Sequence, residues 1–323
     1  MIKIGLLGAG LMGNVHAEMY AKMPDVQVTA LGAFQSFELQ KIQEKHPQIK
    51  PYTDLDAFFN SGIEVIDICL PTFLHKQFIE KSLAHHLDVI TEKPLCRTVQ
   101  EADEILELNQ KSDANVYVAQ VLRFFPEYIY LRNIIKSNRF GALKSLYMGR
   151  YTGLPNWSIN NWLVKPELSG GTALDLQIHD VDVVLFMLGE PCKVTVDMRQ
   201  NKLHIWTRYD YEPDTVVMME GGNDMPPSFG FEMQYHAVFE KGLISYNNNS
   251  NPPLVEFDEK EKRAVNLNEI DSARLDKHIP AGDAYFVELS HFINCIREKK
   301  PSDIVPLESA ARTVQMILNN LSD

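Results

Sequence analysis

The sequence predicts a two-domain α/β protein in which a parallel α/β domain precedes an α+β domain. The chain has 323 residues, about twice the usual length of one domain. Up to residue 122 or so, short apolar runs alternate with helical patterns, which is typical of βαβ units and a parallel sheet. Beyond that point most segments have the composition of strands separated by turns. We therefore expect domains at 1–122 and 123–323.

The first domain is expected to contain five buried strands, because five apolar runs have the length of a strand. They are Ile2–Leu7, Val26–Leu31, Val65–Leu70, Asp88–Thr91 and Val116–Ala119. Between them, apolar residues recur at helical spacing. This spacing predicts helices at 11–22, Glu38–Lys45, His75–Ala84 and Val99–Lys111.

The second domain is expected to place a β-rich middle part between helices. The helical patterns lie at Glu127–Ser137, 172–188, 283–297 and 306–320. Strands are expected at Ser145–Tyr151, Lys193–Met198, Thr215–Met219, Phe229–Phe239, Leu243–Tyr246 and Leu254–Phe257. Residues 156–166 form a loop that contains two tryptophans. The alternating charges of Asp258–Arg263 indicate a solvated hairpin end.

Composition excludes several classes of protein. The net charge of −12 argues against a nucleic-acid or anionic-membrane partner, because both need a basic surface. The four cysteines are far apart and form no CxxC pair, so neither a disulfide framework nor a metal site is expected. No apolar run approaches the roughly 18 residues of a membrane span. We expect a soluble, cytoplasmic protein.

A glycine-rich loop, Gly8-Ala-Gly10-Leu-Met-Gly13, lies between the first predicted strand and the first helix. In this context Gly8 permits a tight turn, Gly10 lets the backbone approach a pyrophosphate, and Gly13 lets helix and strand pack closely. The loop predicts a dinucleotide-binding (Rossmann) domain, in which Leu11 and Met12 also contact the cofactor. A glycine turn without a ligand is the alternative.

The end of the second predicted strand should show whether the cofactor is NAD or NADP. An acidic residue is typical there, because it accepts hydrogen bonds from the adenosine ribose. Ala33 occupies that position, with Gln35 close behind, and neither a carboxylate nor an arginine is present. Both are predicted cofactor-binding residues, and the choice between NAD and NADP stays open.

Lys93 is the first candidate for the chemistry. It lies in Thr91-Glu-Lys-Pro94, directly after a predicted buried strand. Ligands bind at the carboxyl ends of strands in parallel sheets, so Lys93 is expected to project toward the cofactor. A surface lysine beside a turn proline is the alternative.

Asp175 and His179 are the second candidates. They follow Gly170 and Gly171 on a predicted helix and are four residues apart, hence on one face. A carboxylate one turn from an imidazole can fix its tautomer and stabilise its protonated form, as acid–base catalysis requires. An ordinary surface pair is the alternative.

Taken together, these motifs resemble those of the Gfo/Idh/MocA oxidoreductases, the glucose–fructose oxidoreductase and inositol dehydrogenase group. The resemblance spans essentially the whole chain. It rests on the glycine loop, Glu92-Lys93-Pro94, Arg123-Phe124 with Pro126, Gly170-Gly171 leading to Asp175 and His179, and the closing segment 282–292. It implies an N-terminal Rossmann domain and a C-terminal domain with a large, mostly antiparallel sheet. The exposed face of that sheet would join a homodimer or homotetramer.

The resemblance also implies roles for individual residues. Lys93 would hydrogen-bond the reacting oxygen, and His179, oriented by Asp175, would take the proton. Further residues would lie beside the cofactor (Pro71, Thr72, His75, Glu92) or the substrate (Arg123, Trp162). Gln177 stands where the family often has glycine, and Ala33 replaces the usual acidic residue.

The sequence therefore predicts an NAD(P)-dependent dehydrogenase that acts on a hydroxyl or carbonyl carbon of a sugar, inositol or related polyol. The family implies two alternatives, a catalytically silent NAD(P)-binding regulator and a redox-assisted glycosidase. The exact substrate, the direction of the reaction and the size of the oligomer stay open. So does the presence of a cis peptide in Glu92-Lys93-Pro94.

Overall fold

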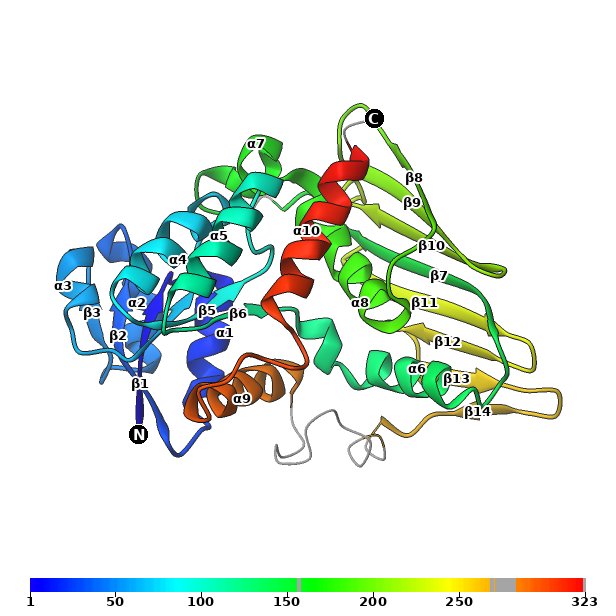
Figure 1. Cartoon of the computed structure of the whole chain (residues 1–323), viewed down its shortest axis with the longest axis horizontal. Coiled ribbons are helices and arrows are strands. Elements are labelled where there is room, and N and C mark those ends of the chain that lie inside the picture. Colours follow the sequence, from blue (N-terminus) through cyan, green and yellow to red (C-terminus); the bar gives the residue numbers. More distant parts are fainter. Residues whose placement is uncertain (156–157, 268–269, 271–282, 322–323) are drawn as a thin grey trace. The chain divides into compact units, whose positions relative to one another are not determined.

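The computed structural model describes all residues except 156–157, 268–269, 271–282 and 322–323. The expected tryptophan-rich loop and the start of the closing segment at Gly282 therefore lie partly outside the described residues. The chain forms two compact units (Figure 1). Where described, the first contains Met1–Val121 and His278–Val314, and the second contains Leu122–Lys277 and Gln315–Asp323.

The first unit differs from the expected domain 1–122 because the chain returns to it after the second unit. Helix α9 (Ala284–Arg297) packs against α1 (Leu11–Tyr20). Phe292 on α9 contacts the buried ring of Tyr117, with ring centroids 5.5 Å apart. The buried apolar face of α9 thus completes the core of the first unit.

The core of the first unit is a six-stranded parallel sheet with the order β3-β2-β1-β4-β5-β6. This order is that of the Rossmann fold, so the predicted fold class is confirmed. The strands are β1 (Ile2–Leu7), β2 (Val26–Gly32), β3 (Lys50–Tyr52), β4 (Val65–Ile68), β5 (Asp88–Glu92) and β6 (Val116–Ala119). Every residue of β4 and β6 is buried, as their apolar runs predict.

The helices of the first unit follow the prediction closely. Besides α1 and α9 they are α2 (Ser36–Lys45), α3 (Leu55–Phe59), the 3₁₀ turn η1 (Thr72–Leu74), α4 (His75–Ala84) and α5 (Val99–Lys111). Asp54 caps α3 and Thr98 caps α5 through side-chain hydrogen bonds. The short elements β3 and α3 were not predicted, because three and five residues are too few to show a period.

The second unit contains an eight-stranded sheet with the order β14-β13-β12-β11-β7-β10-β9-β8, in which only β7 and β10 pair in parallel. The expected large, mostly antiparallel sheet is thus confirmed. Its strands are β7 (Leu143–Thr152), β8 (Lys193–Met198), β9 (His204–Tyr211), β10 (Thr215–Gly222), β11 (Phe231–Phe239), β12 (Leu243–Asn247), β13 (Leu254–Phe257) and β14 (Lys262–Ala264).

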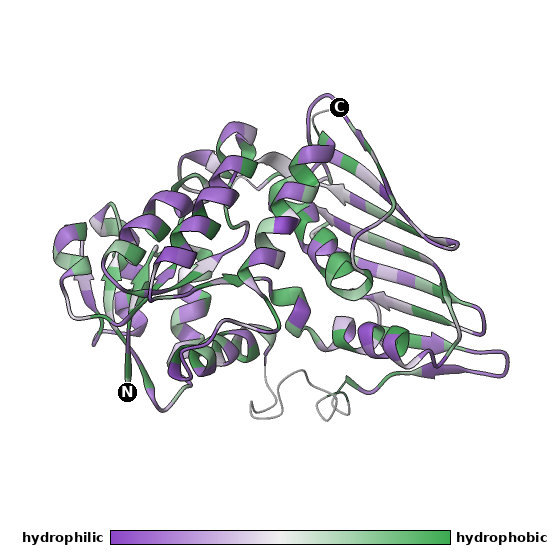
Figure 2. Ribbon diagram, viewed as in Figure 1, coloured by the Kyte–Doolittle hydropathy of each residue, from purple (hydrophilic) through white to green (hydrophobic). Residues whose placement is uncertain are grey.

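Helix α6 (Pro126–Ser137), the π-helix η4 (Ala173–Gln177), α8 (Ile178–Leu188) and the end of α10 (Leu307–Leu321) pack against one face of this sheet. The unit also contains η3 (Ile159–Val164) and α7 (Pro166–Ser169), and the 3₁₀ turn η2 (Val121–Phe124) precedes α6. Tyr235 on β11, for example, donates a hydrogen bond to the Glu127 carbonyl of α6. Along β11, for example, buried side chains on the helix face alternate with more exposed ones on the other face, which we call the open face. Hydrophobic and hydrophilic residues are interspersed along the strands of this sheet (Figure 2).

No helix in the described ranges combines the length and the apolar character that crossing a bilayer requires.

Candidate active site

The glycine loop has the geometry that dinucleotide binding requires. Gly8 has φ +111°, and a Cβ there would lie 2.4 Å from the Cys69 carbonyl oxygen. A Cβ on Gly13 would lie 2.1 Å from the Gly8 carbonyl oxygen, so helix and strand meet without room for a side chain. A Cβ on Gly10 would meet nothing within 4 Å. The fold therefore needs glycine at positions 8 and 13, whereas Gly10 leaves space for a ligand.

This contrast predicts different outcomes for two matched substitutions. Gly13→Ala should lower the free energy of unfolding by about 2–4 kcal/mol, because the methyl group collides with backbone. Gly10→Ala should fold normally, because Gly10 has φ −71° and open space around it. It should raise the Kd for NAD(P) by about tenfold or more, since the methyl group intrudes where the backbone approaches a pyrophosphate. Urea unfolding and fluorescence titration measure the two effects. Unchanged cofactor affinity in Gly10→Ala would contradict this assignment.

The residues that follow Gly10 also fit a bound dinucleotide. Leu11 is 59% exposed and Met12 half-buried at the start of α1, whose first turn contains no acidic residue. The side-chain amide of Asn14 donates hydrogen bonds to the carbonyl oxygens of Ala9 and Gly10 and so closes the loop. Its Oδ1 is buried without a hydrogen-bond partner. The sequence analysis did not identify Asn14. The available signal was a polar side chain directly after the glycine loop, where it can hydrogen-bond the carbonyl oxygens of the loop.

At the end of β2 the predicted ribose-binding residues have local roles. Ala33 is 1% exposed, and its N–H donates to the Tyr52 carbonyl oxygen. Gln35 caps α2 in a reciprocal arrangement with Glu38, whose Oε2 accepts from the Gln35 N–H. Although no acidic residue occupies position 33 or 35, the capping interaction holds the Glu38 carboxylate beside Gln35. Contact of Ala33 or Gln35 with a cofactor stays a prediction.

The segment after β4 is tied to the segment after β5 by His75. Its ring is fully buried, with Nδ1 2.8 Å from the Pro94 carbonyl oxygen and Nε2 2.9 Å from that of Leu70. Burial lowers the pKa of His75, and the two carbonyl oxygens act against that shift. The ring therefore links Pro71 and Thr72 to the Lys93 segment. A direct cofactor contact of Pro71, Thr72 or His75 stays a prediction.

Lys93 emerges from a buried segment. From Val89 to Cys96 every residue is buried except Lys93. Its N–H donates to Glu92 Oε2 at 3.0 Å, and the Lys93–Pro94 peptide bond, left open by the sequence, is cis. The backbone on both sides of Lys93 is therefore anchored, at Glu92 and through Pro94 at His75.

Asp175 and His179 lie on a helix that begins with a π-helical turn. Gly170 and Gly171 have φ +79° and +68°, a conformation that favours glycine. The next turn, η4, is a π-helix that contains Asp175, and α8 follows with His179, so the predicted single helix 172–188 is divided. Between Thr172 and Val184 only Asp175 and His179 are partly exposed. Both side chains are thus accessible, and their joint action at one site stays a prediction.

The other acidic residues of this motif serve the fold. Asp180 holds Arg150 through two hydrogen bonds of 3.0 and 2.9 Å, and Asp182 holds Arg123 through two of 2.8 and 2.7 Å. All four side chains are buried. The Arg123 guanidinium is thus occupied within the second unit, and its contact with a substrate stays a prediction. Trp162, on η3, is partly exposed.

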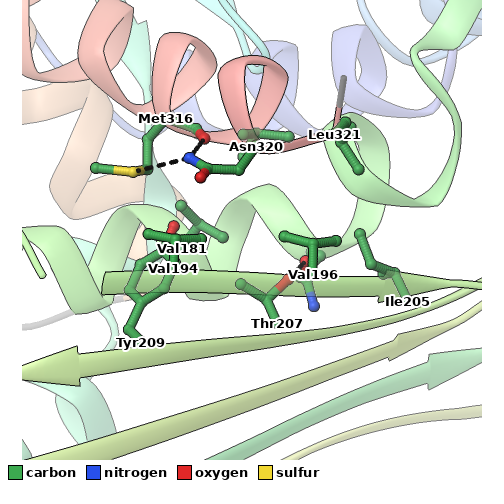
Figure 3. Close-up of a pocket in the computed structure, with 11 residues that line it drawn as sticks. Val181, Val194, Val196, Ile205, Thr207, Tyr209, Met316, Asn320 and Leu321 are labelled. Carbon is green, nitrogen blue, oxygen red and sulfur yellow. Dashed lines mark hydrogen bonds between the residues drawn. The ribbon is translucent and has the colours of Figure 1, made fainter. Parts of the chain in front are cut away.

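Gln177 points away from Asp175 and His179, into the core of the second unit. Its Oε1 accepts from the Thr207 hydroxyl at 2.8 Å and its Nε2 donates to the Met219 carbonyl oxygen. It borders a small, mostly apolar pocket between α8, α10 and strands β8 and β9 (Figure 3). Neither Asp175 nor His179 lines this pocket. The departure from glycine at this position therefore serves packing.

One group of described residues has side chains of the types that bind metal ions. His16, Asp67 and Cys69 place one such atom each within 4.8 Å of one another. His16 Nδ1 and Asp67 Oδ2 are 2.8 Å apart, a hydrogen-bond distance. Burial raises the pKa of the Cys69 thiol to about 12, so it keeps its proton at neutral pH. These contacts describe a hydrogen-bonded cluster, and we assign no metal to it.

The candidate residues thus form two groups. Glu92 and Lys93, with His75 behind them, belong to the first unit, together with the glycine loop. Asp175 and His179 belong to the second.

Two family models match the chain in succession. The first is described as "Oxidoreductase family, NAD-binding Rossmann fold" and matches residues 2–120. The second, the GFO/IDH/MocA C-terminal domain, matches residues 128–238. Together they cover most of the chain, with one match in each of its predicted domains.

Two named relatives are similar over most of their length. An inositol 2-dehydrogenase of Arthrobacter sp. (strain FB24) is 25% identical over 263 residues, which cover 78% of this chain and 75% of the relative. The scyllo-inositol 2-dehydrogenase (NADP⁺) IolU of Bacillus subtilis (strain 168) is 22% identical, with 98% and 93% covered. A levoglucosan dehydrogenase solved with NADH and L-sorbose shares the fold, with a TM-score of 0.85, 16% identity, and coverage of 100% and 96%.

Proposed function

The chain belongs to the Gfo/Idh/MocA family of NAD(P)-dependent oxidoreductases, and from this premise we propose that it oxidises or reduces a sugar, inositol or related polyol at one carbon. Lys93 and His179 would act on the oxygen bound to that carbon, with Asp175 orienting His179. The observation that carries this proposal is that the candidate catalytic side chains are exposed while their neighbours in the chain are buried. In two otherwise buried segments, the accessible side chains are Lys93 in one and Asp175 and His179 in the other.

Hydride transfer to or from a carbinol carbon needs a hydride carrier, a hydrogen-bond donor to the reacting oxygen and a proton acceptor. Bound NAD or NADP would accept or supply the hydride. The Lys93 ammonium can donate a hydrogen bond to an alkoxide, which stabilises the negative charge that develops on the oxygen. His179 can take the proton from the hydroxyl group, since an imidazole titrates near neutral pH. Asp175, one turn away, can stabilise the imidazolium that results.

The substrate class is supported by the relatives and by the site. The two relatives are named for inositols, and the structural neighbour for levoglucosan. A polyol also needs polar and stacking partners. Trp162 offers a partly exposed ring for that purpose, and we place it on the substrate side.

The test is one spectrophotometric assay. The purified protein is mixed with NAD or NADP and a panel of inositols, aldoses and short polyols, and reduction of the cofactor is followed. Turnover that disappears in Lys93→Ala supports the proposal. Tight cofactor binding with no turnover across the panel would favour a catalytically silent regulator. Release of a free sugar from a glycoside without net reduction of the cofactor would favour a redox-assisted glycosidase.

We also propose that the open face of the eight-stranded sheet joins a homodimer or homotetramer. Two apolar side chains of that face, Met218 and Val238, are 36% and 38% exposed. Met218→Arg should shift the sedimenting species toward the 36.8 kDa monomer, because a charge would be buried without a partner. Leu154→Arg, at a 50% exposed leucine that follows β7, is the control and should keep the oligomer. A wild-type protein that sediments as a monomer contradicts this proposal.

A further inference from the structure

His16 lies between two carboxylates in the interior of the first unit. Its ring, on α1, is fully buried. Nδ1 is 2.8 Å from Asp67 Oδ2, at the third position of β4, and Nε2 is 3.3 Å from Glu92 Oε1, at the end of β5. The distance to Asp67 is that of a hydrogen bond, whereas the contact with Glu92 is an ion pair outside hydrogen-bond geometry. Only a protonated ring offers both carboxylates an N–H and a positive charge.

Glu92 connects this ring to Lys93. While its Oε1 faces His16, its Oε2 accepts the hydrogen bond from the Lys93 N–H at 3.0 Å. A carboxylate held at one oxygen presents the other in a defined direction. The contacts therefore run without a break from the Lys93 backbone through Glu92 and His16 to Asp67.

The surroundings of His16 favour a positive charge. Burial lowers its pKa, but the charge of Asp67 and the hydrogen bonds with Asp67 and Cys69 outweigh that effect, and the pKa of His16 is raised well above its ordinary value. The Cys69 thiol stays neutral. Asp67 also accepts from the Tyr20 hydroxyl at 2.8 Å, and burial raises the pKa of Tyr20 well above its ordinary value.

From α9, the remaining titratable groups that face the cluster are Tyr285 and Glu288. Burial raises the pKa of Tyr285 to about 12, with smaller contributions from Glu92 and Glu288. Glu288, which is fully buried, adds negative charge near Tyr20. Among the described residues, the cluster thus includes the carboxyl groups of Asp67, Glu92 and Glu288 together with the imidazole of His16.

We propose that His16 is a positioning residue of the active site, an imidazolium that holds Glu92 and through it the Lys93 backbone at the carboxyl end of β5. This inference rests on the proposed function for its catalytic meaning, but the link from His16 to Lys93 can be measured without substrate. Loss of the charge would leave Asp67 and Glu92 to repel each other, and Glu92 would leave the Lys93 N–H.

The first measurement needs only the wild-type protein. In ¹⁵N NMR spectra at pH 7, both ring nitrogens of His16 should carry a proton. Because the pKa is raised, the charge should be lost only as the pH rises through that value, well above 6.5. A neutral His16 ring at pH 7 would overturn the proposal, whatever the variants show.

The second measurement is amide hydrogen exchange at Lys93. In His16→Gln the Lys93 amide should exchange about tenfold faster or more, since its hydrogen bond to a charged acceptor is lost. His291→Gln is the matched control: this buried histidine of α9 bonds Ser302 and has no part in the link, so exchange at Lys93 should not change. In the double variant His16→Gln/Asp67→Asn the repulsion is removed, and exchange should return toward the wild-type rate.

Equal exchange at Lys93 in wild type and His16→Gln would overturn the proposal. So would a double variant that exchanges faster than His16→Gln, because the effect would then be loss of packing and not of charge. If the wild-type enzyme turns over a polyol, kcat of His16→Gln should fall about tenfold while the Kd for cofactor stays within about threefold. If it shows no turnover, the proposed function fails, yet the ring and exchange measurements still decide the role of His16.

Discussion

Replacing Lys93 by methionine should lower kcat by about 10²- to 10³-fold and leave the Kd for NAD(P) nearly unchanged. The loss corresponds to one hydrogen bond to an oxygen that becomes negative only in the transition state. Methionine matches the length of the lysine chain without its charge. The backbone should not move, because Glu92 and, through Pro94, His75 hold it independently of the side chain. Steady-state kinetics on the best substrate of the panel and a cofactor titration measure the two quantities.

Lys76→Met is the control for this result. Lys76 is a partly exposed lysine of α4 whose ammonium pairs with Glu80 and Glu104, each at 3.0 Å, so its removal should not affect kcat. A parallel loss of cofactor affinity in Lys93→Met would indicate a structural role instead.

If Lys93 and His179 act on one oxygen, the double variant Lys93→Met/His179→Asn should lose less activity than the product of the single losses. Strictly multiplicative losses would contradict a shared oxygen.

The nucleotide-binding half was predictable because its chemistry and its packing use the same local signals. Gly8, Gly10 and Gly13 lie within six residues of one another, so their spacing identifies the loop even though the carbonyl that crowds Gly8 belongs to Cys69. Buried parallel strands are continuous apolar runs, so β1, β4 and β6 can be identified from their own sequences, without knowledge of the strands they pair with. Lys93 could be singled out because the carboxyl end of a strand is a known place for ligands.

Two features were missed for different reasons: one through a local pattern that was overlooked, and one because its partners lie far apart in the chain. Strand β9 was missed because His204, Trp206 and Arg208 make it polar on the open face, while only Ile205, Thr207 and Tyr209 mark its buried face. An alternation search would have found it. His16 and Asp67 are 51 residues apart, so no local pattern joins them.

The π-helical turn at Asp175 has a similar cause. Gln177 bonds Thr207 and Met219, and a Cβ on Gly221 would come 3.3 Å from its Cβ. The π-helical turn η4 is therefore packed and hydrogen-bonded against β9 and β10 through Gln177. Helical period alone predicts a regular helix at this point, and only the packed sheet shows why one turn departs from it.

The largest effect on stability is expected at Asp180. Asp180→Asn should lower the free energy of unfolding by about 3–5 kcal/mol, because it leaves Arg150 charged and buried without its counterion. Both side chains are almost fully buried, and they link β7 to α8. Burial opposes the charge of Arg150, but Asp180 outweighs this effect, so that the pKa of Arg150 is raised. Urea unfolding followed by fluorescence measures the change.

The pair can be separated from its packing by a double replacement. Arg150→Met/Asp180→Leu removes both charges and keeps similar volume, so it should be more stable than Asp180→Asn. Glu107→Ala, which removes the exposed partner of Lys111 on α5, should leave the unfolding midpoint unchanged. If the double variant is instead less stable than Asp180→Asn, the side chains contribute chiefly through shape. The π-helical start of α8, which carries His179, would then be positioned by packing rather than by this ion pair.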